Sequence, residues 1–236
     1  MLDLIAFDAD DTLWHTEHLY VSTREKLERL LDERYALDGV AEALHETEMR
    51  NLERYGYGSK PFVLSMIETT VRLTQGAVRG DEVGQIIGWL HEMQDAEVRL
   101  MDHVQDTVAA LARTRTCIVV TKGDLVDQER KLARSGLAGY FAHCEILPEK
   151  TPQRYQALLD WHGVEPSRFL MVGNSLRSDV LPVAALGAHA VHIPAAVTWI
   201  HEQVDAPGPE QGGYHELAHI GLLPALIEEI ERTPRS

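Results

Sequence analysis

A hydrophobic run passes directly into a cluster of acids near the amino terminus, at Ile5-Ala6-Phe7-Asp8-Ala9-Asp10-Asp11-Thr12-Leu13-Trp14. A short apolar run that ends abruptly in polar residues is typical of a parallel β-strand covered on both faces. The three acids would then follow the carboxyl end of a strand, where open α/β sheets bind ligands. Crowded carboxylates repel one another, and a divalent cation would relieve that repulsion. An acidic turn that merely ends a strand is the plainer interpretation.

The rest of the chain alternates between strand-like and helix-like segments. Short apolar runs predict five strands, at Leu4–Phe7, Cys117–Val120, Cys144–Leu147, Phe169–Val172 and Ala190–Ile193. Amphipathic segments predict a helix capped by Asp106 and further helices at Leu125–Ser135, Gln153–His162, Val180–Leu186 and Leu222–Arg232. The prolines and glycines of residues 206–213 predict a loop. Strands separated by helices imply right-handed crossovers, so the expected fold class is α/β, with a doubly wound, Rossmann-like parallel sheet.

About a hundred residues separate the first two predicted strands, where one crossover helix would suffice. Apolar residues at helical spacing mark four amphipathic segments in this gap, around Leu27, Leu44, Met66 and Ile86. We therefore expect an inserted α-helical domain at residues 15–98. The α/β core would comprise residues 1–14 and 99–236.

The composition excludes several classes of partner. The 236 residues contain 22 Lys and Arg against 37 Asp and Glu, a formal net charge of −15, which would repel nucleic acid and anionic membranes. No apolar run approaches the roughly 18 residues that span a bilayer, and an acid stands where a secretion signal carries basic residues. We expect a cytoplasmic protein that binds neither nucleic acid nor membrane, with Cys117 and Cys144 as buried free thiols.

Three further segments place polar side chains directly after the later strands. Thr121 ends the second strand and offers a hydroxyl and backbone amides to an oxyanion. Lys150 follows the third strand and brings a positive charge. Asn174 and Asp179 follow the fourth strand with side-chain oxygens. Each residue alone is explained as a turn former or a solvated side chain, but together they predict one site.

Taken in order, these segments resemble the haloacid dehalogenase (HAD) superfamily. Its pattern is Asp-x-Asp-x-Thr/Val after the first strand, a strand-end Thr or Ser, a later Lys, and a final acidic motif. The matching residues are Asp8 to Leu13, Thr121, Lys150, and Gly173 to Asp179. The inserted segment lies where the family places its helical C1 cap. The resemblance covers about two thirds of the chain.

The resemblance implies a Mg²⁺-dependent phosphatase that acts on a small soluble phosphomonoester. Asp8 would attack phosphorus and form an aspartyl-phosphate. Asp10 would protonate the leaving alkoxide and later deprotonate the attacking water. Thr121 and Lys150 would bind the phosphoryl group and neutralise its charge.

The same resemblance implies a magnesium site built from oxygen ligands. The ligands would be the Asp8 carboxylate, the Asp10 backbone carbonyl, Asp179 and Asn174. Asn174 stands where many members have Asp, which weakens charge neutralisation but keeps an oxygen ligand. A second departure is Thr151, which follows the lysine where the family more often has Lys-Pro.

Three other residues are candidates for substrate contact. Lys122 follows Thr121 and either reaches the site or faces solvent. In the inserted segment, Tyr57 and Lys60 lie between the second and third predicted helices. They either select the leaving group or belong to a plain helix connector. The histidine pairs, such as His189 with His192, lack the flanking residues of a metal site and are expected to be solvated or hydrogen-bonded.

Other functions stay open at this point. A 2-haloacid dehalogenase of the same fold uses an Asp nucleophile without metal, but characteristically lacks the second acid, which is Asp10 in this chain. A phosphomutase uses both acids and differs in how its cap excludes water. A catalytically silent binding protein would be expected to have lost Asp8, Asp10, Lys150 or Asp179. The pattern does not select among sugar phosphates, nucleotides and other metabolites as substrate, nor between a monomer and a homodimer.

Overall fold

The structure, a computed structural model, describes residues 1–195, 208 and 213–232, and the chain divides into two compact units. The core unit comprises Met1–Glu17, Val98–Lys122 and Glu129–Ser236, and the helical unit comprises His18–Glu97 and Gly123–Gln128. The short segment 123–128 was expected in the core. It groups with the helical unit, where Lys60 Nζ donates to Asp124 Oδ1 (2.8 Å) and Ser59 Oγ donates to Asp127 Oδ2 (3.2 Å). The division into a core domain and a cap domain stays a prediction.

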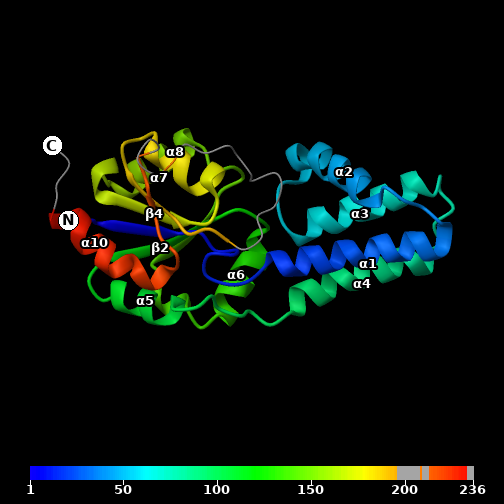
Figure 1. Cartoon of the computed structure of the whole chain (residues 1–236), viewed down its shortest axis with the longest axis horizontal. Helices are drawn as coiled ribbons and strands as arrows, with labels where there is room; N and C mark the ends of the chain where they lie inside the picture. The colour runs from blue at the N-terminus through cyan, green and yellow to red at the C-terminus, as the bar shows by residue number, and fades with distance from the viewer. Residues whose placement is uncertain (196–207, 209–212, 233–236) are drawn as a thin grey trace. The chain divides into compact units, whose positions relative to one another are not determined.

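A six-stranded parallel sheet forms the centre of the core unit (Figure 1). Its order is β3-β2-β1-β4-β5-β6. The strands are β1 (Leu4–Phe7), β2 (Thr116–Thr121), β3 (His143–Ile146), β4 (Phe169–Gly173), β5 (His189–His192) and β6 (His215–Glu216). The doubly wound, Rossmann-like α/β fold is therefore confirmed. The five predicted strands lie within one residue of their observed ends, and β6, an edge strand of only two residues, was not predicted.

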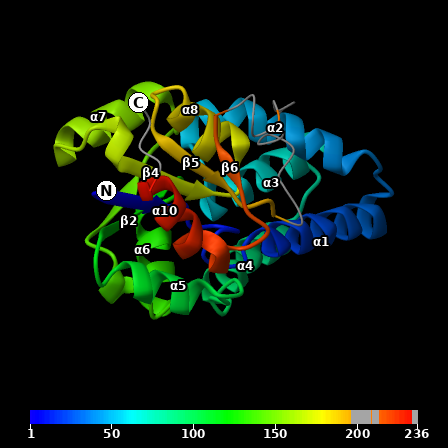
Figure 2. The same ribbon diagram turned by 60° about the vertical axis from the view of Figure 1, so that its left-hand side comes forward.

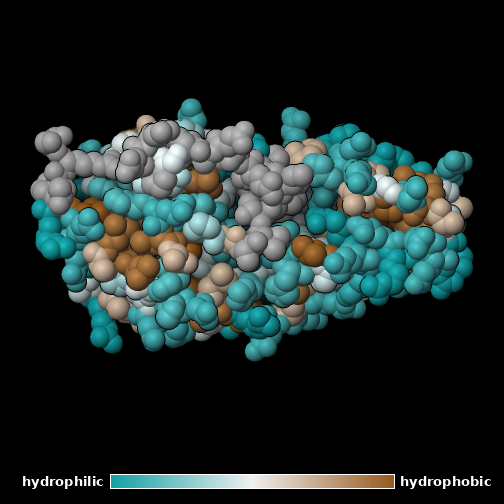
Figure 3. Space-filling view, in the orientation of Figure 1, coloured by the Kyte–Doolittle hydropathy of each residue, from teal (hydrophilic) through white to brown (hydrophobic). Residues whose placement is uncertain are grey.

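Both faces of the sheet are covered, as Figures 1 and 2 show. Ile5 and Phe7 pack in one apolar cluster with α5 (Val104–Leu111) and α10 (Leu223–Arg232). Leu4 and Ala6 point to the opposite face and pack in a second cluster with α7 (Pro152–His162) and α8 (Leu181–Ala184). This alternation explains why β1 is apolar at every position. On the first face, hydrophobic surface is still visible over α10 and α5 in Figure 3.

Three local expectations for the core need correction or fall outside the described residues. Asp106 does not cap α5, because His103 occupies the N-cap and Asp106 lies in the first turn. There its negative charge interacts favourably with the positive end of the helix dipole. The helix expected at 180–186 is a π-helical turn, η3 (Leu176–Val180), followed by α8. The loop predicted at 206–213 lies outside the described residues except for Gly208 and Gly213.

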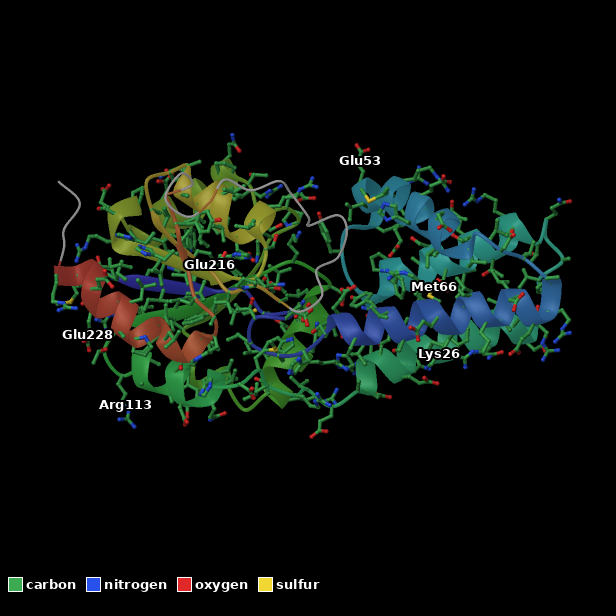
Figure 4. The ribbon with its side chains drawn as sticks, in the orientation of Figure 1. Lys26, Glu53, Met66, Arg113, Glu216 and Glu228 are labelled. Atoms are coloured by element: carbon green, nitrogen blue, oxygen red, sulfur yellow. The ribbon has the colours of Figure 1, made fainter. Side chains whose placement is uncertain are left out.

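The four predicted helices of the inserted segment are present. They are α1 (Glu17–Tyr35), α2 (Val40–Tyr55), α3 (Ser59–Leu73) and α4 (Gly80–Asp95). The core of the helical unit contains the fully buried side chains Leu27, Leu44, Met66 and Ile86, of which Met66 is labelled on α3 in Figure 4. Lys26 on α1 forms an ion pair with Glu92 on α4. Among the described residues, no helix has the length and apolar character to cross a membrane.

A carboxyl group without a hydrogen-bond partner lies inside the helical unit. Glu48 Oε2 on α2 is buried and unpartnered, as is Thr69 Oγ1 on α3. Burial raises the pKa of Glu48 to about 7, and the charge of Arg24 offsets only part of this effect. The folded state therefore binds the Glu48 proton more tightly than the unfolded chain does. The resulting stabilisation is complete below about pH 4 and is lost as the pH rises through 7.

The substitution Glu48→Gln mimics the protonated side chain at every pH. We expect it to raise the free energy of unfolding by about 1–3 kcal/mol at pH 8 and to change it little at pH 4. Urea unfolding at both pH values measures the difference. Glu53→Gln, on the exposed side of the same helix, is the matched control. An equal effect of Glu48→Gln at both pH values would contradict the raised pKa of Glu48.

The last residue of β4, Gly173, has a side chain folded against it. A Cβ atom at this position would clash with the Asp179 carboxylate, at both Oδ2 and Cγ. Only glycine leaves room for Asp179 to turn back on the strand end. By contrast, Gly84 lies in the interior of α4, is exposed, and would leave an added Cβ free of contacts within 4 Å.

Alanine at these two glycines should have opposite effects on stability. Gly173→Ala should lower the free energy of unfolding by about 1–3 kcal/mol or more, because the carboxylate must move. Gly84→Ala should raise it by roughly 0.5–1 kcal/mol, because alanine loses less backbone entropy in a helix. Urea unfolding of both variants tests this. A Gly173→Ala protein as stable as the wild type would show that the placement of Asp179 does not depend on a glycine at this position.

Candidate active site

The four predicted motifs of the core unit meet at one edge of the sheet. Asp8 directly follows β1, Thr121 ends β2, and Asn174 directly follows β4. Lys150 lies just before α7, in the connection from β3, and Asp179 lies in the η3 turn after β4. Because the strands are parallel and adjacent, their carboxyl ends share one edge, as expected for a ligand site in an open α/β sheet.

The Lys150 ammonium joins the first and last motifs. Lys150 Nζ lies 2.5 Å from Asp8 Oδ1 and 2.6 Å from Asp179 Oδ1, and the lysine side chain is 1% exposed. Burial raises the pKa of Asp8 to about 7, although the charge of Lys150 acts in the opposite direction. Burial alone would lower the pKa of Lys150, but Asp179 and Asp8 hold it above its ordinary value. When both carboxylates are ionised, the two acids and the one ammonium leave a formal charge of −1 in this buried group.

Thr12 brings the Asp8 carboxylate and the Asn174 amide together. Its hydroxyl lies 3.3 Å from Asp8 Oδ2 and 3.1 Å from Asn174 Oδ1, so its single proton serves one acceptor at a time. The backbone carbonyl of Asn174 contacts His192 Nε2 at 3.2 Å, and the other ring nitrogen lies 3.0 Å from Glu216 Oε2. Figure 4 labels Glu216 on β6. These contacts hold oxygen atoms from β1 and β4 side by side.

The η3 turn orients Asp179. The Ser175 backbone amide donates to Asp179 Oδ2 at 3.0 Å, and the Ser178 amide donates to Ser175 Oγ at the same distance. Tyr155 from α7 donates its hydroxyl proton to the Ser178 carbonyl at 3.1 Å. The other Asp179 oxygen is held by Lys150. Both oxygens of this buried carboxylate thus have fixed directions.

Asp10 is held by a separate set of donors. Its Oδ1 accepts from Trp14 Nε1 (2.8 Å), Thr16 Oγ1 (2.8 Å) and Lys131 Nζ (2.7 Å). Asp10 is partly exposed, whereas Asp8 is buried. The two acids are only two residues apart, yet their electrostatic surroundings differ.

The third acid of the amino-terminal cluster has a structural role. Asp11 adopts a left-handed backbone conformation with φ of 59°. Its side chain accepts from the backbone amides of Thr16 and Glu17, each at 2.9 Å, at the start of α1. Burial raises the pKa of Asp11, and these amide contacts act against the rise. Asp11 therefore fixes the entry into α1 and does not join the Lys150 group.

The other predicted site residues are distributed between the two units. Thr121 is buried, and its hydroxyl donates to the Lys122 carbonyl at 3.2 Å. Lys122 Nζ donates to Ser178 Oγ at 3.0 Å, so this lysine reaches the motif after β4. Lys60 pairs with Asp124 in the helical unit, and Tyr57 is half-buried in the loop before α3. Substrate contacts by Tyr57 and Lys60 stay predictions.

The second departure from the family pattern also has a local explanation. Thr151 is the N-cap of α7, and its side chain accepts from the Arg154 backbone amide. Pro152 then occupies the first turn of the helix, where its missing amide proton is not needed. The inserted threonine starts the helix directly after Lys150.

Several residues of the site had not been assigned a role from the sequence. Thr12 and Trp14 lie within the opening motif, so their contacts could have been suspected. His192 ends a predicted strand, and only the pairing of β5 beside β4 reveals its contact with Asn174. Lys131 lies in an amphipathic helix, where nothing distinguishes it from a solvated lysine.

The side chains at this edge that could bind a metal offer oxygen atoms as ligands. Among the described residues, no group of three or more His, Cys, Asp or Glu side chains could hold a metal ion. Magnesium needs fewer, because it usually binds through one or two carboxylates and keeps several waters. Asp8, Asp179 and the Asn174 amide oxygen match that preference, and the excess negative charge of the Lys150 group would favour a cation.

Comparisons with known proteins show which family the chain resembles. The family model of the haloacid dehalogenase-like hydrolases matches residues 2–187. A haloacid dehalogenase-like family hydrolase from Xanthomonas campestris is 33% identical, with a TM-score of 0.86 over 98% of this chain and 92% of that chain. No curated protein matches the sequence.

Two further solved structures resemble the chain in fold. A 2-haloacid dehalogenase from Pseudomonas syringae pv. Tomato has a TM-score of 0.65 and 23% identity, over 97% of this chain and 99% of that chain. A predicted phosphoglycolate phosphatase from Haemophilus somnus has a TM-score of 0.63 and 18% identity, over 96% and 98%. With the match to the family model over most of its length, the chain belongs to the haloacid dehalogenase-like hydrolases.

Proposed function

We propose that this hydrolase is a Mg²⁺-dependent phosphatase that acts on a small soluble phosphomonoester. The observation that carries the proposal is the contrast between Asp8 and Asp10. Asp8 is buried against the Lys150 ammonium, whereas Asp10 is partly exposed and held by three donors of its own. Two carboxylates in different environments suit two different roles, a nucleophile and a general acid–base.

The reaction would proceed in two displacements at phosphorus. An Asp8 oxygen attacks, the bond from phosphorus to the leaving oxygen breaks, and Asp10 gives its proton to that oxygen. Asp10 then takes a proton from water, whose oxygen attacks the aspartyl-phosphate and releases Asp8 and inorganic phosphate. Lys150 is already bonded to Asp8 and would neutralise charge on the phosphoryl oxygens, with the Thr121 hydroxyl as a further donor.

Magnesium is the proposed cofactor. Asp8, Asp179, Asn174 and the Asp10 backbone carbonyl would hold it. When bound, it would supply positive charge that offsets the charge of the phosphoryl group. The buried charge of the Lys150 group and the oxygen character of its neighbours support this choice.

A 2-haloacid dehalogenase is the second candidate, and one observation favours it. Lys150 itself neutralises part of the charge of Asp8 and Asp179, and a lysine in this position would serve a halide displacement that uses no metal. Asp10 argues against it, because a departing halide needs no proton from a general acid. A phosphomutase would share both acids.

The two candidates differ in their products. With p-nitrophenyl phosphate, the wild-type protein should release phosphate only when Mg²⁺ is present, and chloroacetate should yield no halide.

Asp8→Asn should abolish phosphate release, because the nucleophile is lost. Asp10→Asn should lower the rate by about 10²- to 10⁴-fold, the usual range for general acid–base catalysis. Asp32→Asn, on the exposed side of α1, is a control for charge removal. Halide release without metal, or full activity of Asp8→Asn, would overturn the proposal.

A further inference from the structure

Three hydrogen-bond donors converge on a single oxygen of Asp10. Trp14 Nε1, Thr16 Oγ1 and Lys131 Nζ all point to Oδ1, at 2.7–2.8 Å. An oxygen that accepts three hydrogen bonds leaves no place for a proton of its own, because that proton would face three donors. Whenever Asp10 is protonated in this arrangement, its proton must therefore lie on Oδ2.

Two of the three donors lie close to Asp10 in the chain. Trp14 and Thr16 are buried, with exposed fractions of 1% and 5%. The backbone amide of Asp11 donates to the Trp14 carbonyl at 2.7 Å, which closes the turn that carries both side chains. These donors are neutral and come from residues four and six positions away from Asp10.

Lys131 is different, because it is charged and comes from a distant part of the chain. It lies on α6 (Leu125–Arg134), 121 positions from Asp10, and its side chain is 17% exposed. A lysine whose ammonium lies in bulk water keeps its rotamer freedom, and an exposed ion pair adds little to stability. This one is largely buried and completes a three-donor arrangement, so the interaction is directional as well as electrostatic.

We propose that Lys131 is a positioning residue for the general acid–base, holding Asp10 by Oδ1 so that Oδ2 is the oxygen that exchanges protons during turnover. The inference rests on the proposed phosphatase function and adds a residue to it. In the first displacement, the Oδ2 proton passes to the leaving oxygen as its bond to phosphorus breaks. In the second, Oδ2 takes a proton from the attacking water. Lys131 itself gains and loses no proton in either step.

Two aryl esters separate this role from a merely structural one. Phenyl phosphate and p-nitrophenyl phosphate differ only in the nitro group, so they should bind alike, but phenolate is the more basic leaving group and needs the proton from Asp10 more. Lys131→Met should slow the first turnover of phenyl phosphate by about 10- to 100-fold. The first turnover of p-nitrophenyl phosphate should change by less than about threefold, followed by a slower steady state, because water attack also needs Asp10. The nitrophenol burst of this variant should therefore be pronounced.

Matched variants complete the experiment. Arg130→Met removes the same charge from the neighbouring, exposed position of α6 and should behave as the wild type does. Lys131→Arg keeps a charged donor and should recover part of the phenyl phosphate rate. Thr16→Val removes a neutral donor to the same oxygen and should reproduce the Lys131→Met pattern more weakly, which provides a test even if Lys131→Met does not fold.

The possible results distinguish the inference from the function on which it rests. An active wild type, with equal slowing of both esters in the Lys131 and Thr16 variants, would overturn the positioning role alone. An active wild type with no change beyond that of Arg130→Met would do the same. A wild type that hydrolyses neither ester would overturn the proposed function, and the inference would fall with it.

Discussion

A single buried ammonium group connects the two ends of the site. Lys150 Nζ bonds to a carboxylate that follows β1 and to another that follows β4. A buried charge without a partner costs several kcal/mol, and removing one member of a buried pair typically costs about 3–5 kcal/mol. The bridge can form only when β1 and β4 are adjacent and in register. The amide of Asp8 extends that pairing by donating to the Val172 carbonyl at 2.9 Å.

The backbone around this bridge is adapted to its charges. Gly173 leaves room for Asp179 to fold back on the strand end, and the π-helical turn that follows aims Asp179 at Lys150. Such turns frequently occur at functional sites. Asp10 is excluded from the bridge because its own donors hold it, so two acids from one loop are kept in separate environments. In the proposed mechanism, this separation lets one carboxylate act as the nucleophile and the other as the general acid–base.

The sequence predicted the sheet well because parallel strands buried on both faces are uniformly apolar, as Leu4–Phe7 is. It predicted the strand-end residues because turns after such strands are where polar side chains gather. It could not predict β6, which has only two residues and depends on pairing with β5. Nor could it predict the hydrogen bonds of Lys131 and His192 at the site, because each joins residues far apart in the chain. The Asp106 cap was wrong because a histidine in a left-handed conformation starts that helix instead.

The family fold supports both phosphatases and dehalogenases, so the side chains of the site determine which reaction occurs. The central claim is that Asp8, beside Lys150, becomes covalently phosphorylated. Rapid acid quenching during turnover, followed by peptide mass spectrometry, tests it most directly. The account predicts a phosphate adduct on the peptide that contains Asp8, formed at least as fast as the enzyme turns over. Turnover of a phosphomonoester with no adduct, or with an adduct on another residue, would contradict it.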